Sequence, residues 1–231
     1  MRQGRSLTSL LLAAAFALAL LCAGCSRTPQ QPEQAQSRTH ESPSKPAQST
    51  APSPPLVAAA RAQIGVTRYY DPAYVQLAYP GGDVSSDRGV CTDVVIRALR
   101  TQGIDLQRAV HEDMRANFTA YPKIWRATST DRNIDHRRVP NLRRWFERQH
   151  WDLPVSDRAA DYRPGDVVTW ELRSGVPHIG IVSDRKSWGR ERPLMLHNIA
   201  IGTQEDDVLF DYPITGHYRP VLKNRAAIVA R

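Results

Sequence analysis

The sequence predicts a folded domain of the α+β class, with N-terminal helices packed on an antiparallel sheet. Up to about residue 149, apolar residues recur mainly at helical spacing. After Trp151, short runs of β-branched and aromatic residues alternate with turn residues, which is typical of strands. Because the helices precede the strands instead of alternating with them, an antiparallel sheet is favoured over a parallel one.

Four segments of the first part are predicted to be helical. An Ala-rich segment at 56–63 is ended by Gly65, and a helix opening at Cys91 is ended by Gly103, which suits a C-terminal cap. Leu106 begins a series of four apolar residues spaced by four, up to residue 118, and Pro140 begins the stretch 141–149. We interpret residues from about 105 to 160 as a helical insertion in the domain.

The strands are predicted from turn signals and from β-rich runs. A Pro-Gly-Asp turn at 164–166 leads into the strand 167–172, and Ser-Gly at 174–175 turns back into 178–183. A third strand is predicted at 194–199, with shorter ones near 208–210 and 217–221. The sequence contains no internal repeat and no phosphate-binding glycine-rich loop.

The N-terminus has the pattern of an export signal. Arg2 and Arg5 precede an apolar run at 7–21, so we interpret residues 1–24 as a signal peptide. The run Leu-Cys-Ala-Gly-Cys-Ser at 21–26 resembles the lipobox of bacterial lipoproteins, in which the leader is cut before the cysteine, here Cys25, and that cysteine receives lipid. In that family Ser26, where other members have Asp, implies the outer membrane, facing the periplasm. An ordinary cleaved signal peptide, giving a periplasmic or secreted protein, and an uncleaved anchor are the alternatives.

Residues 25–55 are predicted to form a disordered tether that follows the lipidated cysteine. From Ser26 to Pro55 the chain has seven prolines, six serines and five glutamines and almost no apolar residue. Such a segment cannot bury enough surface to offset the entropy that ordering costs. Residues 56–231 then make up one domain by the usual size range.

The chain is basic, with a formal charge of +8, or 8 − 2 = +6 once Arg2 and Arg5 leave with the leader. A basic envelope protein is attracted to anionic wall polymers or lipid headgroups. The arginines are scattered and no nucleic-acid-reading motif is present, so nucleic acid is not an expected partner. The sequence does not indicate an oligomeric state.

Cys91 is the only cysteine of the predicted domain. At the first position of a helix, its thiol lies among unpaired backbone N–H groups at the positive end of the helix dipole, which favours the thiolate. A thiolate attacks carbonyl carbon. The alternative is a small buried side chain without a chemical role.

The order of a thiol on a helix N-terminus, a Pro-Gly-Asp turn and strands with His178 and His197 resembles that of the NlpC-type, papain-like cysteine peptidases of bacterial cell walls. The resemblance implies a papain-like fold with Cys91 as nucleophile, His178 in the Pro-His-Ile-Gly-Ile run as base, and His197 as the residue that orients the base. It implies an acyl-enzyme mechanism on an amide bond of peptidoglycan peptides.

Further substrate-contacting residues are proposed around these three. The Tyr69-Tyr70 pair resembles the stretch before the nucleophile in that family, where one tyrosine lines the site, and the sequence does not choose between the two. Asp93 also suits the helix N-terminus, and Asn198 is the alternative orienting residue if the strand register differs.

The chain departs from the usual family pattern in two respects. The usual Asp-Cys-Ser-Gly signature is replaced by Val-Cys-Thr-Asp at 90–93, and about seventy residues separate this helix from the Pro-Gly-Asp turn. The layout, with the run Asn-Ile-Asp-His-Arg-Arg at 133–138, most resembles a bacterial lipoprotein family catalogued as a domain of unknown function.

We therefore expect an envelope thiol hydrolase that needs no cofactor. The histidines show no close ligand spacing, so no metal site is expected. The alternatives are an amidase or acyltransferase on the same scaffold, and a non-catalytic cell-wall-binding lipoprotein.

Overall fold

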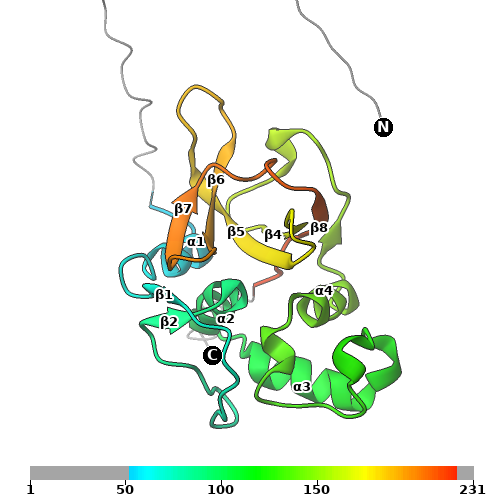
Figure 1. Cartoon of the computed structure of the whole chain (residues 1–231). Coiled ribbons are helices and arrows are strands. Elements are labelled where there is room, and N and C mark those ends of the chain that lie inside the picture. Colours follow the sequence, from blue (N-terminus) through cyan, green and yellow to red (C-terminus); the bar gives the residue numbers. More distant parts are fainter. Residues whose placement is uncertain (1–51, 223–231) are drawn as a thin grey trace, which may run out of the picture. The chain divides into compact units, whose positions relative to one another are not determined.

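The structure, a computed structural model, describes residues 52–222. The predicted signal peptide 1–24, Cys25 and all but the last four residues of the predicted tether lie outside the described residues, as do residues 223–231. Within 52–222 the chain forms a mixed α+β domain in which helices cover a sheet (Figure 1).

The helices lie where the apolar spacing predicts them. They are α1 (Pro55–Arg61), α2 (Cys91–Thr101), α3 (Leu106–Ala116) and α4 (Val139–Arg148), with short 3-10 turns η1 (Phe118–Ala120), η2 (Ile124–Arg126), η3 (Asp135–Arg137) and η4 (Ala159–Asp161).

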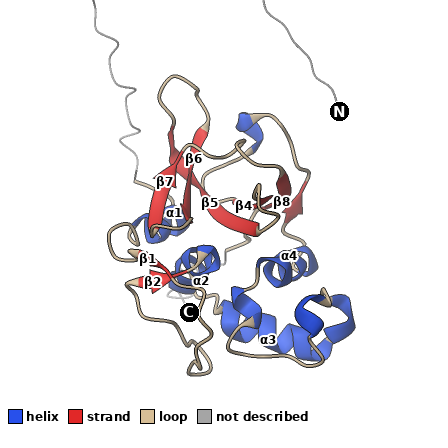
Figure 2. Cartoon of the chain, in the orientation of Figure 1, coloured by secondary structure: helices blue, strands red, loops and turns tan. Residues whose placement is uncertain are grey.

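The main sheet has six strands in the order β3-β8-β4-β5-β6-β7, and every neighbouring pair is antiparallel. The strands are β3 (Asp152–Leu153), β4 (Val167–Glu171), β5 (Pro177–Lys186), β6 (Pro193–Asn198), β7 (Thr203–Asp206) and β8 (Ile214–Tyr218). A separate parallel pair, β1 (Tyr69–Tyr70) and β2 (Arg88–Gly89), precedes α2. Figure 2 shows the helices beside the strands of the sheet.

One strand prediction was wrong. Residues 208–210 form a turn, and the strand lies earlier, at β7, whose sequence Thr-Gln-Glu-Asp has no apolar alternation. An edge strand with one exposed side needs little apolar surface, so periodicity does not reveal it. Leu209 lies in this turn and is nevertheless buried, and its carbonyl accepts the indole N–H of Trp170 at 2.9 Å.

The two faces of the sheet pack against different partners. One face, with Ile179, Ile181 and Leu196, packs on the helices in the larger hydrophobic core. The other face, with Trp170 and Val182, packs on the loops around residues 162 and 209. Because successive residues of a strand point to opposite faces, β5 supplies side chains to both cores.

The region from about 105 to 160 is integrated into the domain. It contains α3 and α4, whose apolar sides belong to the larger core, and it ends in β3. β3 pairs with β8 and forms one edge of the main sheet. The segment therefore contributes both a helical layer and a strand.

None of the helices between residues 52 and 222 is both long enough and apolar enough to span a bilayer.

Candidate active site

Cys91 is the first residue of α2, and its side chain is 5 % exposed. Its sulfur accepts the backbone N–H of Ile179, from the start of β5, and the N–H groups of Thr92 and of Cys91 itself also point toward it. The helix thus delivers the thiol to the beginning of a central strand, next to the residue that follows His178.

The thiol is protonated in the free structure. Burial raises the pKa of Cys91 to about 12; the surrounding backbone N–H groups oppose this rise, and the charge of Asp93 adds to it. The backbone N–H groups at the helix N-terminus favour the thiolate, as predicted, but removal of the sulfur from water has the larger effect on the pKa.

His178 and His197 lie in direct contact. Nε2 of His178 and Nδ1 of His197 are 2.9 Å apart, and both rings are buried. Trp170 faces His178 across the β4–β5 pair, with 5.8 Å between the two ring centroids. Gly180 leaves room for this arrangement, since a Cβ there would lie 3.0 Å from Cβ of His197 and 3.4 Å from the ring of Trp170.

Asp206 of β7 extends this pair of histidines. Its Oδ2 lies 3.4 Å from Nε2 of His197, a buried nitrogen that has no hydrogen-bond partner among the described residues. A carboxylate at this nitrogen favours a proton on it, which leaves Nδ1 of His197 as an acceptor. Nε2 of His178 is then the donor, and Nδ1 of His178 is left with a free lone pair.

The described residues include no hydrogen bond between Cys91 and His178. Cys91 belongs to the core on the helix side of the sheet, whereas the ring of His178 lies with Trp170 on the other side, at the very start of β5. Burial and, to a smaller extent, the neighbouring His197 lower the pKa of His178 to about 3, so the imidazole is neutral at pH 7. The candidate site thus holds a neutral thiol and a neutral imidazole.

Tyr70, rather than Tyr69, lies close to Cys91. Burial raises the pKa of Tyr70 to about 12, with a further contribution from a thiolate charge at Cys91. Tyr69 is 55 % exposed and its ring lies under the guanidinium of Arg68, 5.8 Å away. Of the two tyrosines, Tyr70 is the one whose pKa responds to Cys91.

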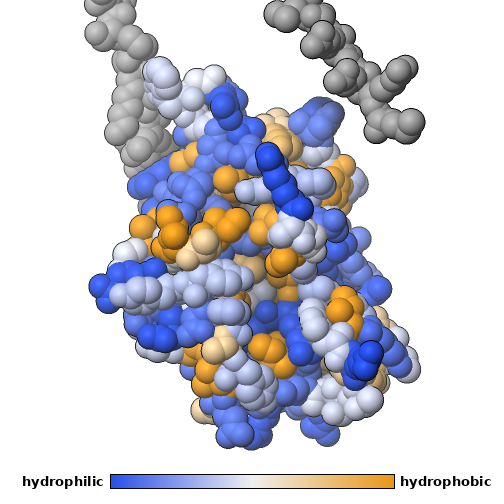
Figure 3. Space-filling model, in the orientation of Figure 1, coloured by the Kyte–Doolittle hydropathy of each residue, from blue (hydrophilic) through white to orange (hydrophobic). Residues whose placement is uncertain are grey.

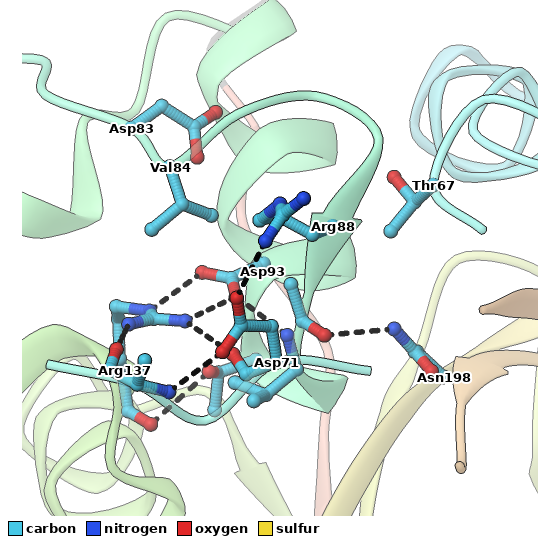
Figure 4. A network of polar contacts seen from close by, with 12 residues as sticks. Thr67, Asp71, Asp83, Val84, Arg88, Asp93, Arg137 and Asn198 are labelled. Atoms are coloured by element: carbon cyan, nitrogen blue, oxygen red, sulfur yellow. Dashed lines mark hydrogen bonds and ion pairs between the residues drawn. The ribbon is translucent and has the colours of Figure 1, made fainter. Parts of the chain in front are cut away.

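Asp93 forms part of the framework of the site and is not exposed to a ligand. It accepts the backbone N–H of Val90 at 2.6 Å, which closes the first turn of α2, and both its oxygens pair with the guanidinium of Arg137, at 3.1 and 3.0 Å (Figure 4). The side chains are 3 % and 2 % exposed. Arg137 also donates to the carbonyls of Asp71 and Ala73. We correct the prediction that Asp93 contacts substrate, because its oxygens are already bonded within the protein.

The same region explains the unusual Val-Cys-Thr-Asp signature. The hydroxyl of Thr92 donates to the carbonyl of Arg137 at 3.1 Å, so two successive residues after the cysteine bind one residue of the 133–138 run. The Val-Cys-Thr-Asp run at 90–93 and the run at 133–138 are thus joined through Arg137.

Asn198 is likewise structural. Its Nδ2 donates to the carbonyl of Gly89 at 3.1 Å (Figure 4), and its Oδ1 accepts the N–H of Gly202 at 3.2 Å. It is fully buried. It ties the end of β6 to the strand that leads into Cys91, and it takes no part in orienting His178, because Nε2 of that ring is bonded to His197.

Sequence reasoning missed three residues of the site: Asp206, Arg137 in its role as partner of Asp93, and Trp170. Alternation from His197 through its register partner Gln204 would place Asp206 on the face of the histidines, but only once β7 is located. No group of three His, Cys, Asp or Glu side chains in the part of the chain that the structure describes is arranged to hold a metal ion.

Chemically, the arrangement offers a thiol beside backbone N–H groups and a neutral imidazole with one nitrogen fixed.

Comparison with known proteins places the chain among uncharacterised relatives. It is 57 % identical, over 165 residues, to "Uncharacterized protein YijF" of Escherichia coli (strain K12), which covers 71 % of this chain and 80 % of that protein. The model of the family described as "Domain of unknown function (DUF1287)" matches residues 57–220. The chain therefore belongs to the DUF1287 family.

Proposed function

We propose that this domain is a thiol hydrolase of the bacterial envelope, with an NlpC-type, papain-like fold, that cleaves an amide bond in peptidoglycan peptides. The observation that carries the proposal is the pairing of His178 with His197 at 2.9 Å directly beside the residue whose N–H contacts the sulfur of Cys91. A nucleophile, a base and a third group that fixes the base are the recurring parts of such sites.

The reaction requires a rearrangement at the start of β5 on substrate binding, because the ring of His178 lies on the other side of the sheet from the sulfur of Cys91 in the free structure. The thiol proton passes to Nδ1 of His178 as the sulfur bonds to the carbonyl carbon, and the carbonyl π electrons move to its oxygen. The backbone N–H of Cys91 stabilises the oxyanion. The imidazolium then gives its proton to the leaving amine, the C–N bond breaks, and an acyl-enzyme forms.

Water completes the cycle. His178, neutral again, takes a proton from water as that water attacks the thioester carbonyl; the C–S bond then breaks, the acid leaves, and the imidazolium returns its proton to the sulfur. His197 orients His178 throughout, and the carboxylate of Asp206 stabilises the proton on Nε2 of His197. The hydroxyl of Tyr70, close to the sulfur, contacts the substrate.

The location follows from the N-terminal pattern as part of the same proposal. Export and lipidation at Cys25 would hold the domain at the outer membrane on a tether, facing the peptidoglycan in the periplasm. Without lipidation the same domain would be periplasmic or secreted.

The buried, protonated thiol favours one second candidate, a wall-binding lipoprotein that keeps the fold without catalysis. A thiol whose pKa is raised to about 12 is a poor nucleophile until a base reaches it. An amidase or an acyltransferase on the same scaffold would use the same three residues and differ in the bond cleaved or in the acceptor of the acyl group.

Digestion of purified wall fragments, followed by mass spectrometry, tests the proposal. Wild type and His150→Asn, a control at an exposed histidine whose backbone is left-handed and suits Asn, should both release new free amines. Cys91→Ala and His178→Ala should release none. No release from any wall fragment by wild type, or equal release by Cys91→Ala, would overturn the hydrolase.

A further inference from the structure

A pocket of about 560 Å³ opens at the end of the sheet where β5 begins. One wall comes from η2 and α4, both in the 105–160 region, and the other from the β4–β5 hairpin and β8. The second wall includes Trp170, whose ring packs on that of His178, and Pro177, which precedes His178 in the sequence. Neither histidine lines the pocket: Trp170 is 1 % exposed and contacts His178 on the face of the sheet away from the helices, so Pro177 is the lining residue nearest to His178 along the chain. Figure 3 shows hydrophobic side chains reaching the surface across the middle of the molecule in this view.

Trp125 is the most exposed large side chain of the pocket. It is 50 % exposed, and both it and Arg126 have positive φ angles, of 60° and 53°. A left-handed backbone costs on the order of 1–3 kcal/mol at a residue other than glycine, and such strain concentrates at ligand sites. The guanidinium of Arg138 lies 4.3 Å from the centre of the indole ring and holds it by a cation–π contact. An indole held open to solvent in this way offers an apolar surface to a ligand.

The pocket lining contains two arginines, Arg143 and Arg144 of α4, and two glutamates, Glu147 and Glu171, so its formal charges balance. Arg143 is engaged with the protein, since it donates to the carbonyl of Thr215 at 2.7 Å and fixes α4 against β8. Arg144 has a side chain 44 % exposed and pairs only with Glu147 of its own helix, at 2.9 Å, among the described residues. A guanidinium has five N–H donors, so Arg144 can bind a second carboxylate through donors that Glu147 leaves free.

We propose that this pocket binds the carboxylate-bearing part of a peptide substrate, with the carboxylate on Arg144 and an apolar or ring portion on Trp125. The inference rests on the proposed hydrolase, because Pro177 brings the pocket to the start of β5, where the backbone N–H of Ile179 contacts the sulfur of Cys91. It assigns a role to the 105–160 region, which supplies Trp125 and Arg144 together. The substrate class is a peptide with a free carboxylate within reach of the cleaved bond.

Calorimetric binding to full-length Cys91→Ala protein tests the pocket without turnover. The probes are a soluble disaccharide tetrapeptide from bacterial wall and the same molecule with its carboxylates amidated. Since hydrogen bonds to charged groups contribute about 1.5–3 kcal/mol, amidation should weaken binding by roughly 10-fold or more. Adding Arg144→Gln should abolish that difference. Adding Trp125→Ala should weaken binding of the free acid by about 10-fold, whereas Trp188→Ala, at a tryptophan 68 % exposed outside the pocket, should leave it unchanged.

Equal binding of both probes, no binding of either, or no effect of Arg144→Gln would overturn the inference. The wall-digestion experiment separates this failure from that of the proposed function. If wild type releases amines but Trp125→Ala and Arg144→Gln keep its KM, the pocket assignment is wrong and the hydrolase stands. If the binding results hold and wild type releases nothing, the pocket stands and the hydrolase is wrong.

Discussion

The ion pair between Asp93 and Arg137 should be among the most costly contacts to break in this domain. Both side chains are almost fully buried, and Arg137 has no other carboxylate partner among the described residues. Asp93→Ala leaves a buried guanidinium uncompensated, which costs about 3–5 kcal/mol. It also leaves the N–H of Val90 without its acceptor, which adds about 1–3 kcal/mol. The expected loss, about 5 kcal/mol, is comparable with the whole stability of many domains, which is about 5–15 kcal/mol.

Arg137→Met should cost about 3–5 kcal/mol, because it leaves the Asp93 carboxylate buried without its counter-charge. The double variant removes both charges, so its loss should be smaller than the sum of the two single losses by at least about 2 kcal/mol. Urea unfolding at neutral pH, followed by circular dichroism, measures each free energy of unfolding. The control pair Arg158→Ala and Asp161→Ala breaks a surface ion pair, which should couple by less than about 1 kcal/mol.

Two results would refute this reasoning. Single losses below about 1 kcal/mol would mean that water reaches the pair in solution. Strict additivity in the double variant would mean that the cost comes from other contacts of the two side chains. If a single variant does not fold, the double variant should still recover a cooperative unfolding transition.

Three further predictions concern the histidines. Burial lowers the pKa of His178 and of His136 to about 3. Below pH 6.5 the unfolded chain therefore binds protons that the folded chain excludes. The free energy of unfolding should then fall as the pH is lowered from about 6.5 toward 3, by up to about 1.4 kcal/mol per pH unit for each histidine. Urea midpoints that are equal at pH 7 and pH 5 would contradict this. Asp206→Asn should lower kcat on wall peptides at least about 10-fold at constant KM, with partial recovery in Asp206→Glu, because the carboxylate orients His197; unchanged kcat would remove Asp206 from the site. Gly180→Ala should destabilise the fold by about 1–3 kcal/mol, since its Cβ would lie 3.0 Å from Cβ of His197, and an unchanged unfolding midpoint would show that His197 can move away without cost.

The elements that bury a periodic apolar face could be predicted from the sequence, and the others could not. The Cys91 helix and β4, β5 and β6 lie where apolar spacing and turn residues indicate them. β7 was not predicted, because this edge strand has no apolar periodicity, and Asp206 was therefore not predicted as part of the site. The pairing of His178 with His197 follows from strand alternation, whereas the protonation of Cys91 depends on burial, which a local pattern does not report.

The roles of polar residues were harder to predict than their positions. Asp93 and Asn198 lie close to Cys91 in sequence or in space, but both form their hydrogen bonds within the protein. Asp93 binds Arg137, and Asn198 binds the backbone carbonyl of Gly89. The sequence position of a polar residue near a candidate nucleophile does not show whether its side chain contacts a ligand or has a structural role. Only the location of its long-range partner, 44 residues away for Asp93, separates the two.

The edges of the main sheet limit how an extended peptide can approach this protein. One edge is β3, only two residues long, and the other is β7, four residues long. In β7 the Glu205 side chain is 7 % exposed and paired with Arg61 and Arg185, and only Asp206 offers a free charge at its exposed part. A peptide that added itself as a further strand would find few backbone groups to bond at either edge. Peptide recognition by strand addition is therefore disfavoured, and the same short edges protect the sheet from pairing with a second copy of the chain.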